Sequence, residues 1–322
     1  QLDFRASDMK VTSITGKWLR EAEAIERRIE SGTIISESRR DRSSAEANPG
    51  FMLTDSRGGC YICNLIYSGA HRASFSLTSD GMTHIVWGIN PDLFSWDLQK
   101  GSRFESPEAV MAYSEDGQAE ASARMHAFIR SSICRGEWAE RMRPLMLNTW
   151  ESVYYNASED KILEMAKGAK GIGLEGVIVG DGWFGARRSE RTSLGDWHVN
   201  TMKFPSGLFS LAQGIHRLGL LFGLWFEPEC VSDRSELYKT HPEWIIGRSA
   251  EENAGRAGKE ILNLTLPAVQ DWMIETLSST IDRCRIDYIV WDMTRSYSDI
   301  FSQMGAWDGG EFLHKYILGL YT

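Results

Sequence analysis

Short apolar stretches separated by turn residues fill the first part of the chain, residues 1–138. Apolar and polar residues alternate at 73–77 (ASFSL), which is the period of a strand with one buried face. Clusters rich in Gly, Asn, Asp and Ser interrupt these stretches at 48–50, 56–59 and 79–81. Short strands with frequent turns are typical of an antiparallel β-sandwich, so we predict a β-sandwich domain over 1–138.

The second part of the chain, residues 139–322, has longer apolar runs that alternate with helical stripes. Apolar residues recur at helical spacing within 162–169, 208–218 and 269–281. We expect five strands, at 145–147, 176–179, 220–226, 261–264 and 286–292. Strands alternating with helices predict right-handed βαβ units and a parallel sheet, either doubly wound or most of a (β/α)8 barrel.

Carboxylates and tryptophans follow these strands at the same end. They are Trp150, Glu151, Asp181, Trp183, Trp225, Glu227, Glu229, Trp291 and Asp292. An indole ring suits the C–H face of a sugar, and a carboxylate can accept hydrogen bonds from hydroxyls or react at the anomeric carbon. A doubly wound nucleotide fold instead needs a glycine-rich loop after its first strand, whereas the glycine cluster at 168–173 suits the end of a helix. The sequence therefore favours a barrel mouth that binds sugar.

Each of these residues also has a purely structural interpretation. Asp292 could cap a helix after its strand, because Asp is favoured at that position. Trp225 could pack inside the barrel, and Trp183 could anchor a loop. Glu227 and Glu229 could hold loops near the site without taking part in a reaction.

Composition and charge exclude several other classes of function. The chain carries 44 acidic and 35 basic residues, a net charge of −9, which argues against nucleic acid and anionic membranes as partners. No apolar run approaches the roughly 20 residues that span a bilayer. Five cysteines favour reduced thiols and a cytoplasmic setting. Cys60 and Cys63 lie three apart in an expected strand and point to opposite faces, so we expect no metal or redox pair there, and no metal or other cofactor in the chain.

Several motifs in this order closely resemble the glycoside hydrolase family 36 α-galactosidases. They are WGINP (87–91), CRGEW (134–138), DGWFG (181–185), LGDW (194–197), GLWFEPE (223–229) and WDM (291–293). The resemblance implies an N-terminal β-supersandwich followed by a (β/α)8 TIM barrel, of which about five of the eight strands are present. It also implies retaining hydrolysis of terminal α-galactosides of the melibiose and raffinose type, without a metal, in a homo-oligomer that is often a tetramer.

Carried over to these positions, the resemblance assigns roles to five residues. Asp292 is expected to be the nucleophile that forms the glycosyl-enzyme ester. Asp181, Trp225, Trp183 and Arg256 are expected to bind or surround the sugar. A retaining enzyme needs an ionised carboxylate on a rigid support beneath the anomeric carbon, which agrees with Asp292 at the end of its strand.

Three positions depart from the family pattern. Gly180 stands where a second aspartate is usual, Val290 where a lysine is usual, and Thr294 where an asparagine is usual. The first two changes remove charged groups that would bind sugar hydroxyls. Losing a partner of a desolvated polar group typically costs about 1–3 kcal/mol. A degenerate relative that at most binds sugar, or an enzyme for another α-linked sugar such as N-acetylgalactosamine, therefore stays open.

The ends of the sequence favour a piece of a longer protein. The first residues, 1–5, lack an initiator Met and a signal peptide, so we expect the start of the sandwich to be missing. In the family the acid/base aspartate lies on a later strand, beyond residue 322. We therefore expect the parent protein to be an active α-galactosidase and this chain alone to be inactive.

Overall fold

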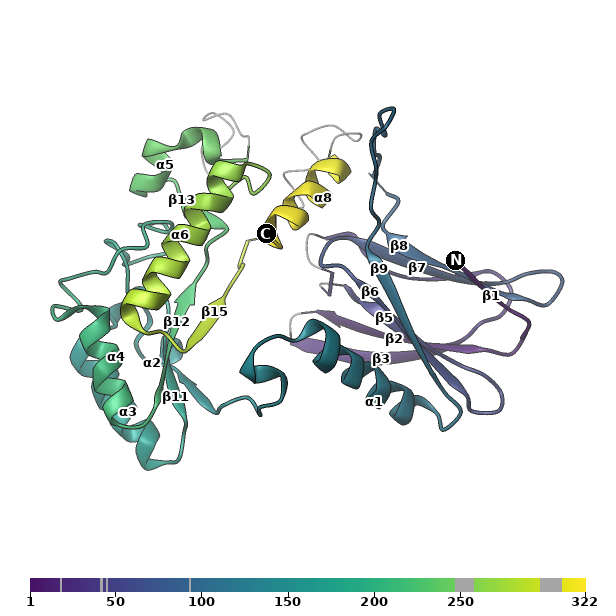
Figure 1. Cartoon of the computed structure of the whole chain (residues 1–322), viewed down its shortest axis with the longest axis horizontal. Helices are drawn as coiled ribbons and strands as arrows, with labels where there is room; N and C mark the ends of the chain where they lie inside the picture. The colour runs from purple at the N-terminus through teal and green to yellow at the C-terminus, as the bar shows by residue number, and fades with distance from the viewer. Residues whose placement is uncertain (18, 41–42, 45, 93, 247–257, 296–308) are drawn as a thin grey trace. The chain divides into compact units, whose positions relative to one another are not determined.

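The computed structural model describes residues 1–322 except 18, 41–42, 45, 93, 247–257 and 296–308. The described residues form two compact units, Gln1–Met142 with Tyr297–Ile317 and Arg143–Ser296 with Leu318–Thr322 (Figure 1). Each unit is described by itself below.

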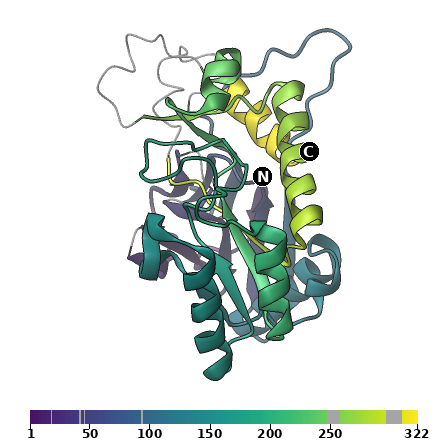
Figure 2. The same ribbon diagram turned by 90° about the vertical axis from the view of Figure 1, so that its left-hand side faces the viewer.

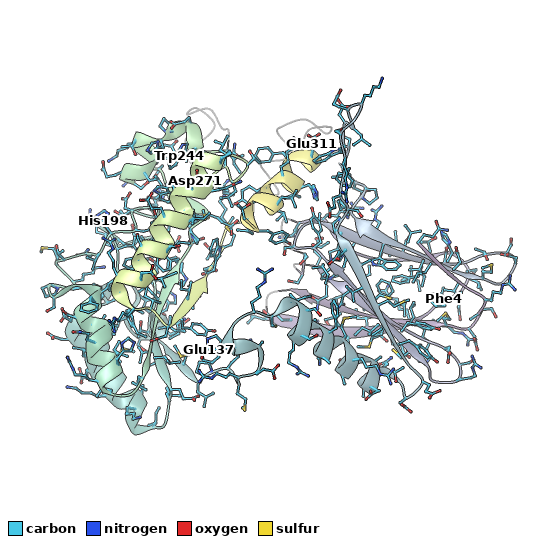
Figure 3. All side chains as sticks on the ribbon, viewed as in Figure 1. Phe4, Glu137, His198, Trp244, Asp271 and Glu311 are labelled. Atoms are coloured by element: carbon cyan, nitrogen blue, oxygen red, sulfur yellow. The ribbon has the colours of Figure 1, made fainter. Side chains whose placement is uncertain are left out.

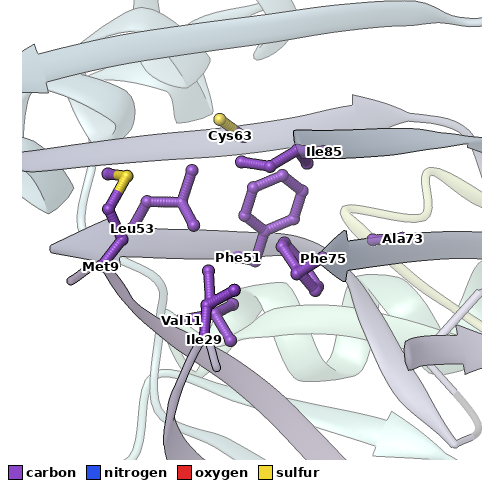
Figure 4. Close-up of a cluster of buried hydrophobic side chains, with 9 residues drawn as sticks. All are labelled: Met9, Val11, Ile29, Phe51, Leu53, Cys63, Ala73, Phe75 and Ile85. Carbon is purple, nitrogen blue, oxygen red and sulfur yellow. The ribbon is translucent and has the colours of Figure 1, made fainter. Parts of the chain in front are cut away.

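The first unit is an antiparallel β-sandwich, as the alternating pattern predicted. One sheet has the order β1 (Leu2–Phe4), β8 (Thr83–Ile89), β7 (His71–Leu77) and β4 (Thr33–Ser38). The other has the order β3 (Arg20–Arg28), β2 (Lys10–Lys17), β5 (Ala47–Thr54), β6 (Cys60–Ile66) and β9 (Glu108–Ser114). Inward-facing residues of the two sheets meet in a core that includes Phe51 and Phe75, whose rings lie edge to face at 4.8 Å (Figure 4).

The helix α1 (Gln118–Phe128) covers the outer face of β6. Its buried residues Ala121 and Met125 pack with Cys60 and Ile62, whereas Cys63 lies in the core between the sheets. The two thiols therefore point to opposite faces of β6, as their spacing predicted. After α1 come a π-helical turn (Ile129–Ile133) and a 3₁₀ turn (Glu137–Ala139).

The second unit contains a parallel sheet covered by helices. Its strand order is β10 (Met146–Asn148), β11 (Gly176–Val179), β12 (Leu221–Phe226) and β15 (Tyr288–Trp291). The helices α3 (Glu159–Gly171), α4 (Gly207–Arg217) and α6 (Pro267–Cys284) stand side by side along the sheet (Figures 1 and 2). The helix α3 ends within the glycine cluster, where Gly173 has φ 84°, so the cluster is a helix end and no phosphate loop.

One predicted strand belongs to a different sheet from the one expected. The run at 261–264 was expected in the parallel sheet, but β14 (Lys259–Ile261) pairs antiparallel with β13 (Cys230–Ser232). In the part of the chain that the structure describes, the parallel sheet thus has four strands and not five. A short, fully buried apolar run has the same pattern in a parallel sheet and in a buried antiparallel ribbon, so periodicity could not separate them.

The described residues form several further helical elements. They are α2 (Trp150–Val153), a 3₁₀ turn (Tyr154–Asn156), α5 (Glu236–Thr240), a 3₁₀ turn (Pro242–Trp244) and α8 (Gly309–Leu320). Ser235 caps α5 by accepting a hydrogen bond from the Tyr238 N–H. The Trp244 ring, labelled in Figure 3, stacks on His241 with centroids 3.9 Å apart and closes this turn.

Candidate functional site

Three parallel strands bring acidic residues to one edge of the second unit. Asp181 follows β11, Glu227 and Glu229 follow β12, and Asp292 follows β15. The strands are paired with Val179 beside Leu224 and Phe226 beside Trp291, so their carboxyl ends coincide. We call this set, with Trp225, the carboxyl edge. In parallel α/β proteins this edge is where ligands bind and reacting groups are presented.

Both carboxylate oxygens of Asp292 are held by neutral donors. The indole Nε1 of Trp225 donates to Oδ2 at 3.1 Å, and the backbone N–H of Met293 donates to Oδ1 at 2.8 Å. The Asp292 N–H donates to the Phe226 carbonyl at 2.8 Å, which extends the ladder of β12 and β15 by one residue. The carboxylate is therefore fixed in position at the end of its strand.

Asp181 is engaged in a buried ion pair. Arg187 donates from Nε to Oδ1 at 2.9 Å and from Nη2 to Oδ2 at 2.7 Å. The Arg187 side chain is 1% exposed and also donates from Nη1 to the carbonyls of Glu190 and Thr192. This bidentate pair holds the loop after β11 in one conformation.

A second cation supports the same loop. The Lys203 ammonium donates to the carbonyls of Tyr155, Gly182 and Arg187, each at 2.7 Å. Burial lowers the pKa of Lys203. Burial, with the charge of Asp181 as a smaller cause, raises the pKa of Tyr155 to about 12. Three carbonyls on one ammonium tie the loops after β10 and β11 together.

Trp183 and Trp225 are both buried, but they contact different groups. Trp183 is fully buried, donates from Nε1 to the Trp225 carbonyl at 2.8 Å, and meets the Phe226 ring edge to face at 5.3 Å. Trp225 is 8% exposed and directs its indole N–H to Asp292. The structure thus brings Trp225 and Asp292 into direct contact and joins Trp183 to them through the backbone.

Glu227 forms the second buried ion pair of the carboxyl edge. Its Oε2 lies 2.7 Å from the Lys259 ammonium, and its Oε1 accepts from the N–H and Oγ1 of Thr294 at 2.8 and 2.6 Å. The Glu227 side chain is 1% exposed. Glu229 accepts a hydrogen bond from the Trp291 indole at 3.0 Å.

The position of Gly180 is crowded by the neighbouring strand end. Its N–H donates to Thr149 Oγ1 at 3.1 Å, and a Cβ built on it would lie 3.0 Å from Trp150 Cβ and 3.2 Å from Trp150 Cα and N. An aspartate there would require the backbone of Trp150 to shift. Arg256, the fifth predicted site residue, lies outside the described residues.

Sequence reasoning missed three basic residues of this site: Arg187, Lys203 and Lys259. Arg187 lies in a charged run, ARRSER (186–191), that gives no sign of which residue turns inward. Lys259 meets partners 32 and 35 residues away. A buried carboxylate at a strand end needs a cation as partner. This requirement was the one signal in the sequence that basic residues would lie at the site.

The described residues lack two features, a cluster of metal-binding side chains and a membrane-spanning helix. Within those ranges, no three or more His, Cys, Asp and Glu side chains are grouped so that they could hold a metal ion. No helix in the described part of the chain is long and apolar enough to cross a membrane.

The fold and the carboxyl edge together define a class of protein. A β-sandwich followed in the chain by a parallel α/β unit, with carboxylates and indoles at its strand ends, is typical of glycoside hydrolases. Residues 103–322 match the melibiase family, and residues 1–99 match the glycosyl hydrolase family 36 N-terminal domain. The chain belongs to the melibiase family, the α-galactosidases of glycoside hydrolase family 36.

Curated relatives and solved structures agree with this assignment. The chain is 38% identical over 326 residues to α-galactosidase AgaA of Geobacillus stearothermophilus and 37% identical over 327 residues to α-galactosidase Mel36A of Lactobacillus acidophilus. These matches cover 99% and 100% of this chain but 45% of each relative. The crystal structure of AgaA superposes with a TM-score of 0.91 at 37% identity, over 99% of this chain and 45% of that one. The chain thus spans less than half the length of these relatives.

Proposed function

We propose that the protein is a retaining glycoside hydrolase that removes terminal α-D-galactosyl residues, with Asp292 as its nucleophile. The observation that carries this proposal is the fixation of the Asp292 carboxylate by the Trp225 indole and the Met293 N–H. One oxygen of Asp292 would bond to the anomeric carbon as the bond to the leaving oxygen breaks. Water would then hydrolyse this ester and restore the carboxylate.

The proposed substrates are α-galactoside oligosaccharides. Variants of the related AgaA have been crystallised with raffinose and with stachyose, which supports this class for the present protein. Asp181, Trp225 and Arg256 are proposed to bind the sugar, and Trp183, which is fully buried, is proposed to surround the site through its hydrogen bond to the Trp225 carbonyl. In this proposal the parallel sheet is the first part of a (β/α)8 barrel, and residues 1–138 and 139–322 are parts of separate domains.

A second candidate is an enzyme of the same kind with a different α-linked sugar as substrate, for instance N-acetylgalactosamine. Two observations support this second candidate. Both oxygens of Asp181 are engaged by Arg187, and position 180 has no side chain. A pocket with fewer charged partners for sugar hydroxyls would accept a different substituent on the ring.

Covalent trapping tests the role of Asp292. A fluorinated α-galactosyl fluoride has a leaving group that needs little protonation, so it reports the attack by the nucleophile alone. We expect mass spectrometry to find the glycosyl group on the peptide that contains Asp292. Asp292→Ala should abolish labelling, and Asp282→Ala, a change of an exposed aspartate on α6, should not. Labelling of another residue, or equal labelling of Asp292→Ala, would reject the proposal. The same labelling experiment with the corresponding N-acetylgalactosaminyl fluoride tests the second candidate. Faster labelling of Asp292 by this reagent than by the galactosyl fluoride would favour N-acetylgalactosamine as the substrate sugar.

A further inference from the structure

The ammonium of Lys259 joins two strand ends of the carboxyl edge. It lies 2.7 Å from Glu227 Oε2, directly after β12, and 2.5 Å from Thr294 Oγ1, shortly after β15. Lys259 itself lies in β14 of the antiparallel ribbon and not in the parallel sheet. Neither β12 nor β15 has a basic residue, and Lys259 therefore carries a positive charge to this part of the edge from outside the parallel sheet.

Two side chains that follow or end β12 contact the chain at and just after Asp292. The Trp225 indole contacts its carboxylate, and Glu227 binds Thr294 two residues further along the chain. Two residues span at most about 7 Å, and the Lys259 ammonium contacts Thr294, so Lys259 lies beside the strand end that carries Asp292. This position makes the Lys259 ammonium a candidate partner for a ring hydroxyl of a sugar whose anomeric carbon faces Asp292.

The hydrogen-bonding capacity of Lys259 is not exhausted by these contacts. An ammonium has three N–H donors. Two are directed to Glu227 and Thr294, and among the described residues no acceptor is found for the third. The Lys259 side chain is 16% exposed, whereas Glu227 is 1% exposed, so the ion pair opens to solvent on the side of the lysine.

We propose that Lys259 is a specificity-determining, substrate-binding residue. Glu227 and Thr294 hold its ammonium in place, and its remaining N–H donates to one hydroxyl of the sugar that Asp292 attacks. This inference rests on the proposed role of Asp292. Because the donor is charged and held in advance, it discriminates strongly between sugars that have this hydroxyl and sugars that lack it.

Aryl galactosides that each lack one ring hydroxyl test this contact. The probes are 2,4-dinitrophenyl α-galactoside and its monodeoxy analogues, and the measured quantity is kcat/KM for release of dinitrophenolate. With the unmodified chain, one analogue should react about 10–100-fold more slowly than the parent sugar, as expected for a lost charged hydrogen bond. In Lys259→Met the parent should fall to the rate of that analogue, and removal of the same hydroxyl should then have no effect. A uniform loss over all sugars would overturn the proposal, because it would indicate a structural role alone.

Two further variants keep the test decisive. Lys259→Met leaves Glu227 buried without its cation, which threatens folding, so the double variant Glu227→Gln, Lys259→Met is measured alongside. Lys239→Met is the control, because Lys239 is an exposed lysine that pairs with Glu236 on α5. The control should retain the full discrimination between sugars.

The same sugars separate a failure of this inference from a failure of the proposed function. If the unmodified chain releases no more dinitrophenolate than Asp292→Ala, the function is rejected. Calorimetry with methyl α-galactoside and its deoxy analogues then decides about Lys259. An affinity loss for one hydroxyl that disappears in Lys259→Met keeps the assignment, and absence of sugar binding rejects it.

Discussion

At the scale of single residues, the carboxylates of the carboxyl edge differ in their partners. Asp181 has a guanidinium and Glu227 an ammonium, each in a buried ion pair. Asp292 is held by an indole and a backbone N–H, which are neutral donors. A carboxylate whose charge is balanced by a cation is a poor nucleophile, whereas one that is positioned without neutralisation keeps its reactivity. This difference supports the proposed role of Asp292 as the nucleophile.

Removing Arg187 should destabilise the second unit strongly. Arg187→Met leaves the Asp181 carboxylate, 10% exposed, without its cation, and breaking a buried pair typically costs about 3–5 kcal/mol. Urea unfolding followed by tryptophan fluorescence would measure the change in unfolding free energy. The control Arg188→Met, at an exposed position, should stay within about 0.5 kcal/mol of the parent. An equally small effect of Arg187→Met would show that Asp181 finds another partner.

His314 should make the first unit less stable in mild acid. Burial lowers its pKa, and its ring lies among Phe94, Trp96 and Phe104 with Nδ1 3.1 Å from the Tyr67 hydroxyl. The folded state thus resists protonation, while the unfolded chain gains a proton below about pH 6.5. Stability is complete above that pH and falls as the pH drops from 7.5 to 5, by at most about 1.4 kcal/mol per pH unit for one group.

A histidine substitution isolates this contribution. In His314→Gln the loss of unfolding free energy between pH 7.5 and pH 5 should be smaller than in the parent, because one titrating group is gone. His126→Gln, at an exposed position on α1, should keep the parent's pH dependence. An unchanged pH dependence in His314→Gln would assign the effect to other groups, such as buried His71, whose pKa burial also lowers.

At the scale of secondary structure, the helix α6 ends in a strained residue. Arg285 closes the helix in the left-handed conformation, with φ 51° and ψ 56°, and its side chain is exposed. A residue with a Cβ is disfavoured there, and glycine is not. Arg285→Gly should therefore raise the unfolding free energy of the second unit by about 0.5–1 kcal/mol. Arg283→Gly, in the last turn of α6, should lower it by about 1 kcal/mol. Urea unfolding of both variants checks the opposite signs.

The sequence predicted those elements whose pattern is local. Alternation revealed the β-sandwich, and helical stripes revealed α3, α4 and α6, because side-chain burial repeats along each element. Strand ends also carry local information, which is why the sequence placed Trp225 and Asp292 at the carboxyl ends of their strands. The pairing of β14 with β13 and the meeting of Lys259 with Glu227 depend on residues about 30 positions apart. Such contacts are decided by tertiary packing and leave no periodic trace in the sequence.

At the scale of the whole molecule, the chain contains one part of the proposed chemistry. Retaining hydrolysis uses a nucleophile and a second carboxyl group about 5–5.5 Å away that protonates the leaving oxygen. At the carboxyl edge, among the described residues, Asp181 and Glu227 are paired with cations and Glu229 accepts from Trp291. We propose that none of these three carboxylates is the acid, so that the described residues of this edge supply the nucleophile alone.

This division predicts a strong dependence of the chain's reactivity on the leaving group. Dinitrophenolate leaves without a proton, so 2,4-dinitrophenyl α-galactoside needs Asp292 alone, whereas a sugar leaving group such as that of raffinose needs a general acid. Since general acid catalysis contributes about 10²–10⁴-fold, we expect the ratio of kcat/KM for the two substrates to exceed that of AgaA by at least about a hundredfold. Dinitrophenolate absorbance and galactose release measure the two rates, with Asp292→Ala as the blank. A ratio equal to that of AgaA would mean that one of the edge carboxylates leaves its partner and acts as the acid, and Glu227→Gln and Glu229→Gln would then identify it.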